Sequence, residues 1–358
     1  MIICLAICMC CVISDIIFIS KLISLKDEAS ETKATTVSSL APETDASGNL
    51  ITLDTTSSSE TEQTTEPTQI SRTQTVDAAT RSTNLTALQT KISDYLSKQS
   101  GRYSVYYINM NNNETMGYKE NQPIVAASAI KIAYNTYLYE KADAGEFKME
   151  DKMAYKATGY KDGVEGGDYE SGTGTIQNSA DGTEYTLQEV SHLSITISDN
   201  CATNMILRRL GGEDAVNNNF LKTISSVVDY RSKVTYTDYA GTEQSGRRRT
   251  SAMDLAKYAE HLYKDYKSKP ERFQPLIDDL CNTEYSWGVA AGVSSASTYK
   301  VAHKVGFRGN TYNDIGIVFG TEDYVLALMT ESGDASRAQS IMGEVSKMVY
   351  EYIESNYA

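Results

Sequence analysis

Residues 123–134 read PIVAASAIKIAY, and the interpretation of the whole sequence depends on this stretch. In it, Ser128 and Lys131 stand three residues apart, and an apolar run follows. If a helix begins near Ser128, the two side chains share one face of that helix. A serine at a helix N-terminus can attack a carbonyl group, and a lysine shielded from water can lose its proton and act as a base. The same letters also fit an N-capping serine beside a solvated lysine.

A second polar segment, residues 195–204, reads ITISDNCATN and lies between two runs with helical spacing, 187–193 and 205–210. Ser198 and Asn200 stand two residues apart in it, so a hydroxyl and an amide can reach one substrate. Ordinary helix capping explains the same residue types.

The third segment, residues 303–307, reads HKVGF within a predicted strand. A strand lysine next to glycine places a cation where a substrate can approach the backbone edge. A solvated edge-strand lysine is the alternative. Strand alternation predicts that His303 points away from such a cleft.

Strand-like segments occur at both ends of the region 84–358, and helical runs fill its middle. This order favours an α+β fold, with one antiparallel sheet built from both ends of the domain and a helical insert. The expected strands are 103–110, a short one ending at 118, 299–305, 312–319 and 324–330, and the expected last helix is 335–355.

Together and in this order, the three segments resemble the S-x-x-K, S-D-N and K-T-G motifs of class A β-lactamases and penicillin-binding serine enzymes. Residues 250–255 (TSAMDL) and 312–318 (YNDIGIV) resemble further segments of that family, so the likeness covers 84–358. The resemblance implies the β-lactamase/transpeptidase-like fold, with an all-helical subdomain beside the sheet.

The resemblance also implies a role for each matching residue. Ser128 would be the nucleophile, Lys131 the base that activates it, and Ser198 the group that protonates the leaving nitrogen. An oxyanion hole would consist of the backbone N–H groups of Ser128 and Phe307. The residues expected to bind the substrate are Asn200, Lys304, Gly306 and Phe307.

Two departures from the family pattern affect the expected chemistry. Class A enzymes carry an E-x-x-L-N glutamate that activates the deacylating water, and residues 228–249 lack this pattern. Asp238 and Glu243 are the acids near the right place, and each also reads as a plain surface acid. Val305 replaces a Thr or Ser that helps to hold the substrate carboxylate, and valine cannot donate a hydrogen bond. Arg308 is a candidate cation for that carboxylate, or a solvated turn residue.

Composition divides the chain of 358 residues into three parts. Residues 1–25 are mostly apolar and predict an uncleaved membrane anchor or a cleaved signal segment. Residues 26–83 are rich in Ser and Thr and predict a disordered extracytoplasmic stalk. Four of the six cysteines lie in 1–25, which leaves Cys201 and Cys281 as free thiols or a disulfide pair.

The net charge of −14 argues against a nucleic-acid partner, and the Cys and His spacing against a structural zinc site. The sequence therefore predicts a monomeric, anchored serine hydrolase of a Gram-positive bacterium that needs no metal or cofactor. Its expected substrate is a β-lactam, hydrolysed through an acyl-enzyme with slow deacylation. The alternatives are a D-alanyl-D-alanine peptidase or other amide or ester hydrolase, and a non-catalytic cell-wall-binding domain.

Overall fold

The computed structural model describes residues 74–161, 165–296 and 298–357. The expected anchor, 1–25, lies outside these residues, as does most of the expected stalk. Among the helices of the described part, none is long and apolar enough to cross a membrane. Helix α2 (Ala78–Ser97) starts ahead of the expected domain start at 84, because Asp77 caps it by accepting a hydrogen bond from Thr80 N. Arg81, in the first turns of α2, forms ion pairs with Glu114 and Glu322.

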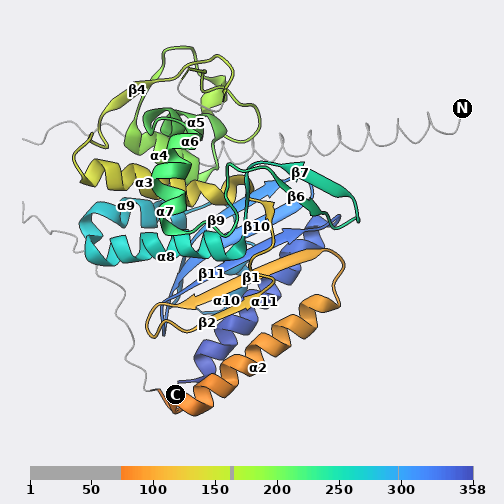
Figure 1. The fold of residues 1–358 in the computed structure, drawn as a ribbon. Coiled ribbons are helices and arrows are strands. Elements are labelled where there is room, and N and C mark those ends of the chain that lie inside the picture. Colours follow the sequence, from red (N-terminus) through yellow and green to blue (C-terminus); the bar gives the residue numbers. More distant parts are fainter. Residues whose placement is uncertain (1–73, 162–164, 297, 358) are drawn as a thin grey trace, which may run out of the picture. The chain divides into compact units, whose positions relative to one another are not determined.

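The centre of the fold is a five-stranded antiparallel sheet in the order β2-β1-β11-β10-β9 (Figure 1). Strand β1 pairs with β11, so the two ends of the domain meet in one sheet, as predicted from the sequence. The strands are β1 (Arg102–Asn109), β2 (Thr115–Tyr118), β9 (Lys300–Arg308), β10 (Thr311–Phe319) and β11 (Tyr324–Glu331).

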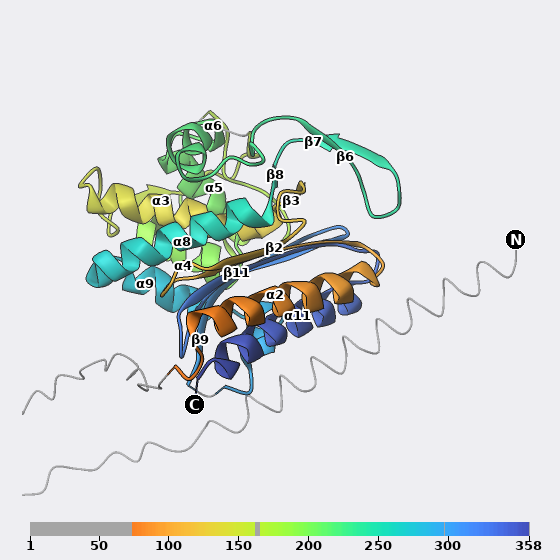
Figure 2. The same ribbon diagram turned by 60° about the horizontal axis from the view of Figure 1, so that its bottom comes forward.

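Helices cover both faces of this sheet (Figures 1 and 2). One face packs against α2, α10 (Val289–Val293) and α11 (Ala335–Ser355). The other face packs against α8 (Ala252–Ser268) and α9 (Pro270–Cys281). Strand β11 is buried along its whole length, and its side chains alternate between the two hydrophobic clusters. Burial on both faces explains why its sequence is almost wholly apolar.

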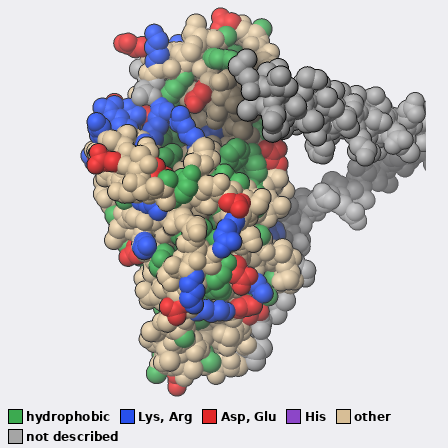
Figure 3. Space-filling model, turned by 90° about the vertical axis from the view of Figure 1, so that its right-hand side faces the viewer, with side chains coloured by type: hydrophobic (Ala, Val, Ile, Leu, Met, Phe, Trp, Pro, Cys, Tyr) green, Lys and Arg blue, Asp and Glu red, His purple; other side chains and the backbone are tan. Residues whose placement is uncertain are grey.

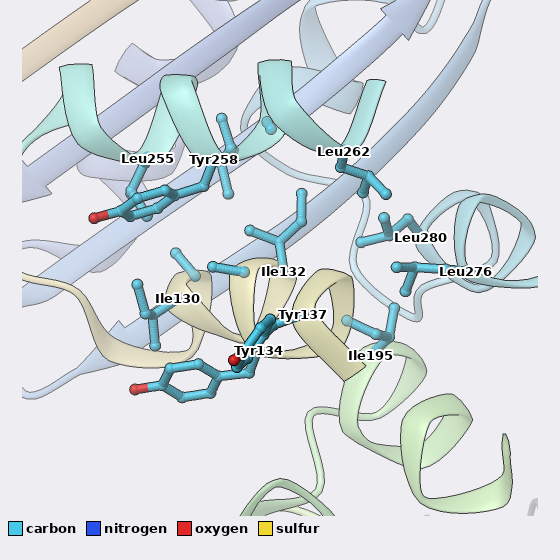
Figure 4. Close-up of a cluster of buried hydrophobic side chains, with 14 of the residues drawn as sticks. Ile130, Ile132, Tyr134, Tyr137, Ile195, Leu255, Tyr258, Leu262, Leu276 and Leu280 are labelled. Carbon is cyan, nitrogen blue, oxygen red and sulfur yellow. The ribbon is translucent and has the colours of Figure 1, made fainter. Parts of the chain in front are cut away.

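The helical subdomain lies beyond α8 and α9, and its central helix is α3 (Lys131–Asp143). Figure 4 shows Ile132 of α3 pointing toward α8, and Ile195 of α4 (Leu187–Thr196) lying near Leu276 of α9. Tyr137 lies on another side of α3, where its ring stacks on that of Phe220, with the ring centroids 4.8 Å apart. Helix α5 (Asn200–Arg209) packs against α3 and α4. Because α3 is surrounded, its first eight residues after Lys131 are all buried, which fixes the position of its N-terminus.

Shorter elements complete the fold. A hairpin of β6 and β7 occupies part of the stretch where the family glutamate was sought, and the sequence analysis did not predict it. The short strand pairs are β3 (Ile124–Val125) with β8 (Arg249–Thr250), β4 (Lys152–Ala154) with β5 (Glu184–Thr186), and β6 (Val234–Thr237) with β7 (Glu243–Gly246). The short helices are η1 (Ala127–Ile130), η2 (Ile176–Asn178), α6 (Glu213–Val216), η3 (Asn217–Leu221) and α7 (Lys222–Ile224).

Asp254, in the first turn of α8, holds the chain at residues 225–228. Its fully buried carboxylate accepts hydrogen bonds from Val227 N and Val228 N (both 2.9 Å), and from the hydroxyls of Ser225 and Ser251. Replacing Asp254 with Ala leaves these donors without an acceptor. We expect a loss of about 3–4 kcal/mol in the free energy of unfolding, measured by urea denaturation. Asp94→Ala, on an exposed face of α2, is the control and should change stability by less than about 0.5 kcal/mol. Equal shifts for both variants would contradict this role of Asp254.

Candidate active site

A cavity of about 480 Å³ lies between the edge of the sheet and the helical subdomain. Ser128, Lys131, Ser198, Asn200 and Phe307 all line it. The fold therefore brings together residues from the three sequence segments that lie far apart along the chain. The other lining residues are Val125, Ala127, Ile130, Tyr134, Tyr160, Glu170, Ser171, Gly172, Thr173, Thr203, Asn204, Leu207, Glu213, Tyr230, Arg248 and Arg308.

Ser128 lies in η1, the turn that leads directly into α3. Ala127, the residue before it, has a φ of 48°, an uncommon conformation for a residue with a side chain. Asn313 of β10 holds this turn, because its Nδ2 donates to the carbonyl oxygens of Val125 (2.8 Å) and Ala126 (3.0 Å). No hydrogen bond joins the Ser128 hydroxyl to another described side chain, so this half-buried hydroxyl is available at the cavity wall.

Gly306 allows the edge strand β9 to approach the Ser128 turn. A Cβ atom at position 306 would lie 2.4 Å from Ala129 N and 2.9 Å from Ser128 N, which no real side chain tolerates. Glycine is therefore required at position 306 because the backbone of β9 packs directly against the backbone of the Ser128 turn. This close packing places the next residue, Phe307, at the cavity wall. The Phe307 side chain is 44% exposed.

Lys131 is buried at the base of the cavity, and its Nζ faces the S-D-N segment. Nζ donates hydrogen bonds to Ser198 O (2.8 Å), to Asn200 Oδ1 (3.0 Å) and to Ser198 Oγ (3.3 Å). Burial lowers the pKa of Lys131 to about 7, against the opposing effects of the nearby negative charges of Asp199 and Glu170. An amine with such a pKa is partly neutral at physiological pH, which a general base requires.

The turn that carries Ser198 and Asn200 is held by backbone and side-chain contacts. Ser198 has a φ of 58°, and Asp199 caps α5 by accepting from Ala202 N (2.9 Å). The hydroxyl of Ser198 is buried beside Lys131, whereas Asn200 is half-buried. The capping interpretation is thus correct for Asp199, while Ser198 and Asn200 contact Lys131.

Lys304 occupies a different place from the one expected. It is fully buried and does not line the cavity. Its Nζ donates to Val305 O (3.4 Å) and lies 5.8 Å from the centre of the Tyr285 ring. Burial, with repulsion from Lys131, holds the pKa of Lys304 well below its usual range. These conditions disfavour a permanent cation at Lys304.

Val305, which replaces the family's Thr or Ser, is buried and does not line the cavity. Two arginines do line it. Arg308 is exposed there. Arg248 also lines it and forms an ion pair with Glu213 (2.9 Å). Figure 3 shows Lys and Arg side chains gathered in patches on one face of the molecule, although the net charge is −14. Arg308 therefore remains the candidate for a substrate carboxylate.

None of the three acids of the stretch 228–249, which are Asp229, Asp238 and Glu243, lines the cavity. Asp238 accepts hydrogen bonds from Ala240 N and Thr242 N at the tip of the β6–β7 hairpin, and Glu243 is exposed on β7. The surface-acid interpretation of both residues agrees with these positions. The carboxylate groups that do line the cavity belong to Glu170 and Glu213, which the sequence analysis did not single out.

The remaining candidates lie away from the cavity chemistry. Cys201 and Cys281 are free thiols. His303 is buried and contacts Asp314 (3.0 Å) and Tyr285 O (3.1 Å), and it is not a lining residue. Among the described residues, the His, Cys and acidic groups that could hold a metal ion are Glu140, His261 and Asp265, whose ligand atoms lie within 4.8 Å of one another. These three residues do not line the cavity. The ion pair of His261 with Glu140 (2.5 Å) explains why their ligand atoms lie close together.

A serine hydroxyl and a buried lysine of lowered pKa in one cavity are the groups that a serine hydrolase of the Ser–Lys type uses. Comparison with known proteins agrees, because the model of the β-lactamase enzyme family matches residues 87–353. This chain therefore belongs to the β-lactamase enzyme family. It is 27% identical over 267 residues to a β-lactamase of Streptomyces albus G, covering 72% of this chain and 82% of that one.

Solved structures of similar fold include both β-lactamases and a penicillin-binding protein. PBP-A is 27% identical, with a TM-score of 0.63, and the match covers 76% of this chain and 97% of PBP-A. A point mutant of PBP-A, solved as an acyl-enzyme complex with penicillin G, is 26% identical with a TM-score of 0.62, over the same shares of both chains. An ancestral class A β-lactamase matches at 21% identity with a TM-score of 0.59, over 74% of this chain and 99% of that one, and this likeness concerns the fold alone. The predicted β-lactamase/transpeptidase-like fold is thus confirmed.

Proposed function

We propose that this protein hydrolyses β-lactam amides through a covalent acyl-enzyme on Ser128. The observation that carries the proposal is the position of Lys131 Nζ, buried at the cavity base and bonded to Ser198 and Asn200. Among the described residues, the groups bonded to Lys131 Nζ are backbone carbonyl, hydroxyl and amide oxygens, all of them neutral. Such an arrangement is costly unless the neutral amine is used.

The proposed acylation step uses the groups that line this cavity together. Neutral Lys131 takes the proton of the Ser128 hydroxyl, whose oxygen attacks the lactam carbonyl carbon. The oxyanion that forms accepts hydrogen bonds from the backbone N–H groups of Ser128 and Phe307. The C–N bond then breaks, and Ser198, within 3.3 Å of Lys131, passes the proton to the leaving nitrogen. Asn200 and Arg308 would bind the amide side chain and the carboxylate of the substrate.

A D-alanyl-D-alanine peptidase is the second candidate. Two observations favour it: the likeness to PBP-A, a mutant of which was solved as an acyl-enzyme complex with penicillin G, and the absence of an acid from residues 228–249 at the cavity wall. Such an enzyme would form the same adduct with penicillin but would release it slowly.

Incubation of the full chain with a fluorescent penicillin, followed by intact-mass measurement over time, tests the proposal. We expect a mass increase of one penicillin, located on Ser128 by peptide mapping, that then disappears as product accumulates. An adduct that persists for hours would favour the peptidase. No adduct and no turnover would contradict both candidates.

We further propose that the protein acts outside the cytoplasm of a Gram-positive cell as a monomer. Residues 1–25 would hold it at the membrane, and the residues from 26 to the start of α2 at Ala78 would act as a stalk. The apolar composition of the first segment and the Ser and Thr content of the second support this proposal. Fractionation of producing cells into membrane and medium tests it, and protein found only in the cytoplasm would contradict it.

A further inference from the structure

Glu170 brings a carboxylate to the cavity from an unexpected part of the chain. It precedes the Gly172-Thr173-Gly174 loop and lines the same cavity as Ser128 and Lys131. It is half-buried and belongs to the segment between β4 and η2 rather than to residues 228–249. The chain thus has an acid at the cavity wall although the family pattern for one is missing.

The loop that carries Glu170 is fastened to the S-D-N turn. Thr173 Oγ1 donates to Ser198 O (2.7 Å), and Asn200 N donates to Thr173 O (3.1 Å). Gly174 has a φ of 106°, and a Cβ there would lie 2.2 Å from Asp199 Cγ. At Glu170 itself, the Cys201 thiol lies 3.5 Å from both the backbone N and O atoms. The position of Glu170 is therefore set by the same turn that contacts Lys131.

The side chain of Glu170 is held by α5. Asn204 Nδ2 donates to Glu170 Oε2 (3.2 Å), and Asn204 lies one helical turn after Asn200, whose Oδ1 accepts from Lys131 Nζ (3.0 Å). Glu170 also lies close enough to Lys131 for its negative charge to act on the pKa of that amine, in the direction that raises it. Among the described residues no other hydrogen bond engages this carboxylate, which leaves Oε1 able to accept a proton from water.

We propose that Glu170 is the general base of deacylation, in place of the missing glutamate of residues 228–249. This assignment rests on the proposed acyl-enzyme at Ser128. Glu170 takes one proton from a water molecule, whose oxygen forms a bond with the acyl carbon. The ester bond from that carbon to Ser128 Oγ then breaks, and the proton returns to Oγ. Free serine and the ring-opened acid are the products, and no further reactant is needed.

The test compares acylation and deacylation in Glu170→Gln and wild type. Glutamine keeps the shape and can still accept the hydrogen bond from Asn204, but it cannot take up a proton from water. With a fluorescent penicillin, we expect acylation within a few-fold of wild type and deacylation slower by about 10²–10⁴-fold. Stopped-flow labelling gives the first rate, and decay of the adduct in intact-mass spectra gives the second. Glu184→Gln, an exposed acid of the same subdomain outside the cavity, should leave both rates unchanged.

A structural role for Glu170 predicts a different result. Loss of loop order would slow acylation as much as deacylation and lower the melting temperature, which would overturn the assignment. Deacylation of Glu170→Gln at the wild-type rate, or a wild-type adduct that never decays, would overturn it as well. A Glu170→Asp variant should recover part of the deacylation rate if the carboxylate is the base. A wild type that forms no adduct at all would instead contradict the function on which the assignment rests.

Discussion

Replacing Ser128 with Ala is expected to abolish the penicillin adduct and to lower turnover by on the order of 10⁴–10⁶-fold. The reason is that the Ser128 hydroxyl is the nucleophile at the cavity wall, and alanine offers no atom to form the ester. Intact-mass spectra after incubation with a fluorescent penicillin measure the adduct, and a chromogenic β-lactam measures turnover.

This variant also separates an enzyme from a binding domain of the same fold. Ser128 is half-buried at the cavity surface and its hydroxyl holds no other described group, so its removal should leave the melting temperature nearly unchanged. Ser294→Ala, an exposed serine after α10, is the matched control and should label as wild type does. Equal hydrolysis by Ser128→Ala and wild type, or none by either, would favour the non-catalytic cell-wall-binding domain.

Replacing Lys131 with Met is expected to slow acylation by about 10²–10⁴-fold, since methionine cannot accept the proton of Ser128. The pH profile of the wild type adds a second measurement. The pKa of Lys131 is lowered to about 7, and the neutral amine is the active form, so acylation should rise with pH through 7 and level off above 8. At pH 6 roughly a tenth of the maximal rate should remain.

Folding of Lys131→Met should not limit this experiment, because a buried amine is replaced by an apolar side chain of similar length. Lys141→Met, at the far end of α3 and outside the cavity, is the control for a lysine lost from the same helix. Acylation that is independent of pH between 6 and 8, or that survives in Lys131→Met, would show that another group is the base.

The cavity wall differs from the family pattern in which residues supply its acids. The stretch where the family has its glutamate contains the β6–β7 hairpin, and its residues Asp238 and Glu243 do not line the cavity. Tyr134, Tyr160 and Tyr230 line the cavity together with Glu170 and Arg248. Much of the cavity wall therefore consists of residues that the motifs do not include.

The sequence alone determined the sheet, the helical insert and the three segments that meet at the cavity. The last helix, 335–355, and the strands of the sheet were predictable from the spacing of their apolar residues. This spacing is a local property of the sequence and does not depend on which elements pack against it. Ser128 and Lys131 were predictable because three residues of helix place them on one face whatever surrounds them.

Only the tertiary structure decided the pKa shifts of Lys131 and Lys304 and the presence of Glu170 at the cavity. Lys304 looked like a cation beside a strand edge, but complete burial beside Lys131 disfavours its charge. Glu170 carries no motif, and it joins the cavity because the S-D-N turn and Asn204 hold its loop in place. Burial and contacts between distant segments arise from packing, and a local pattern of residues does not contain them.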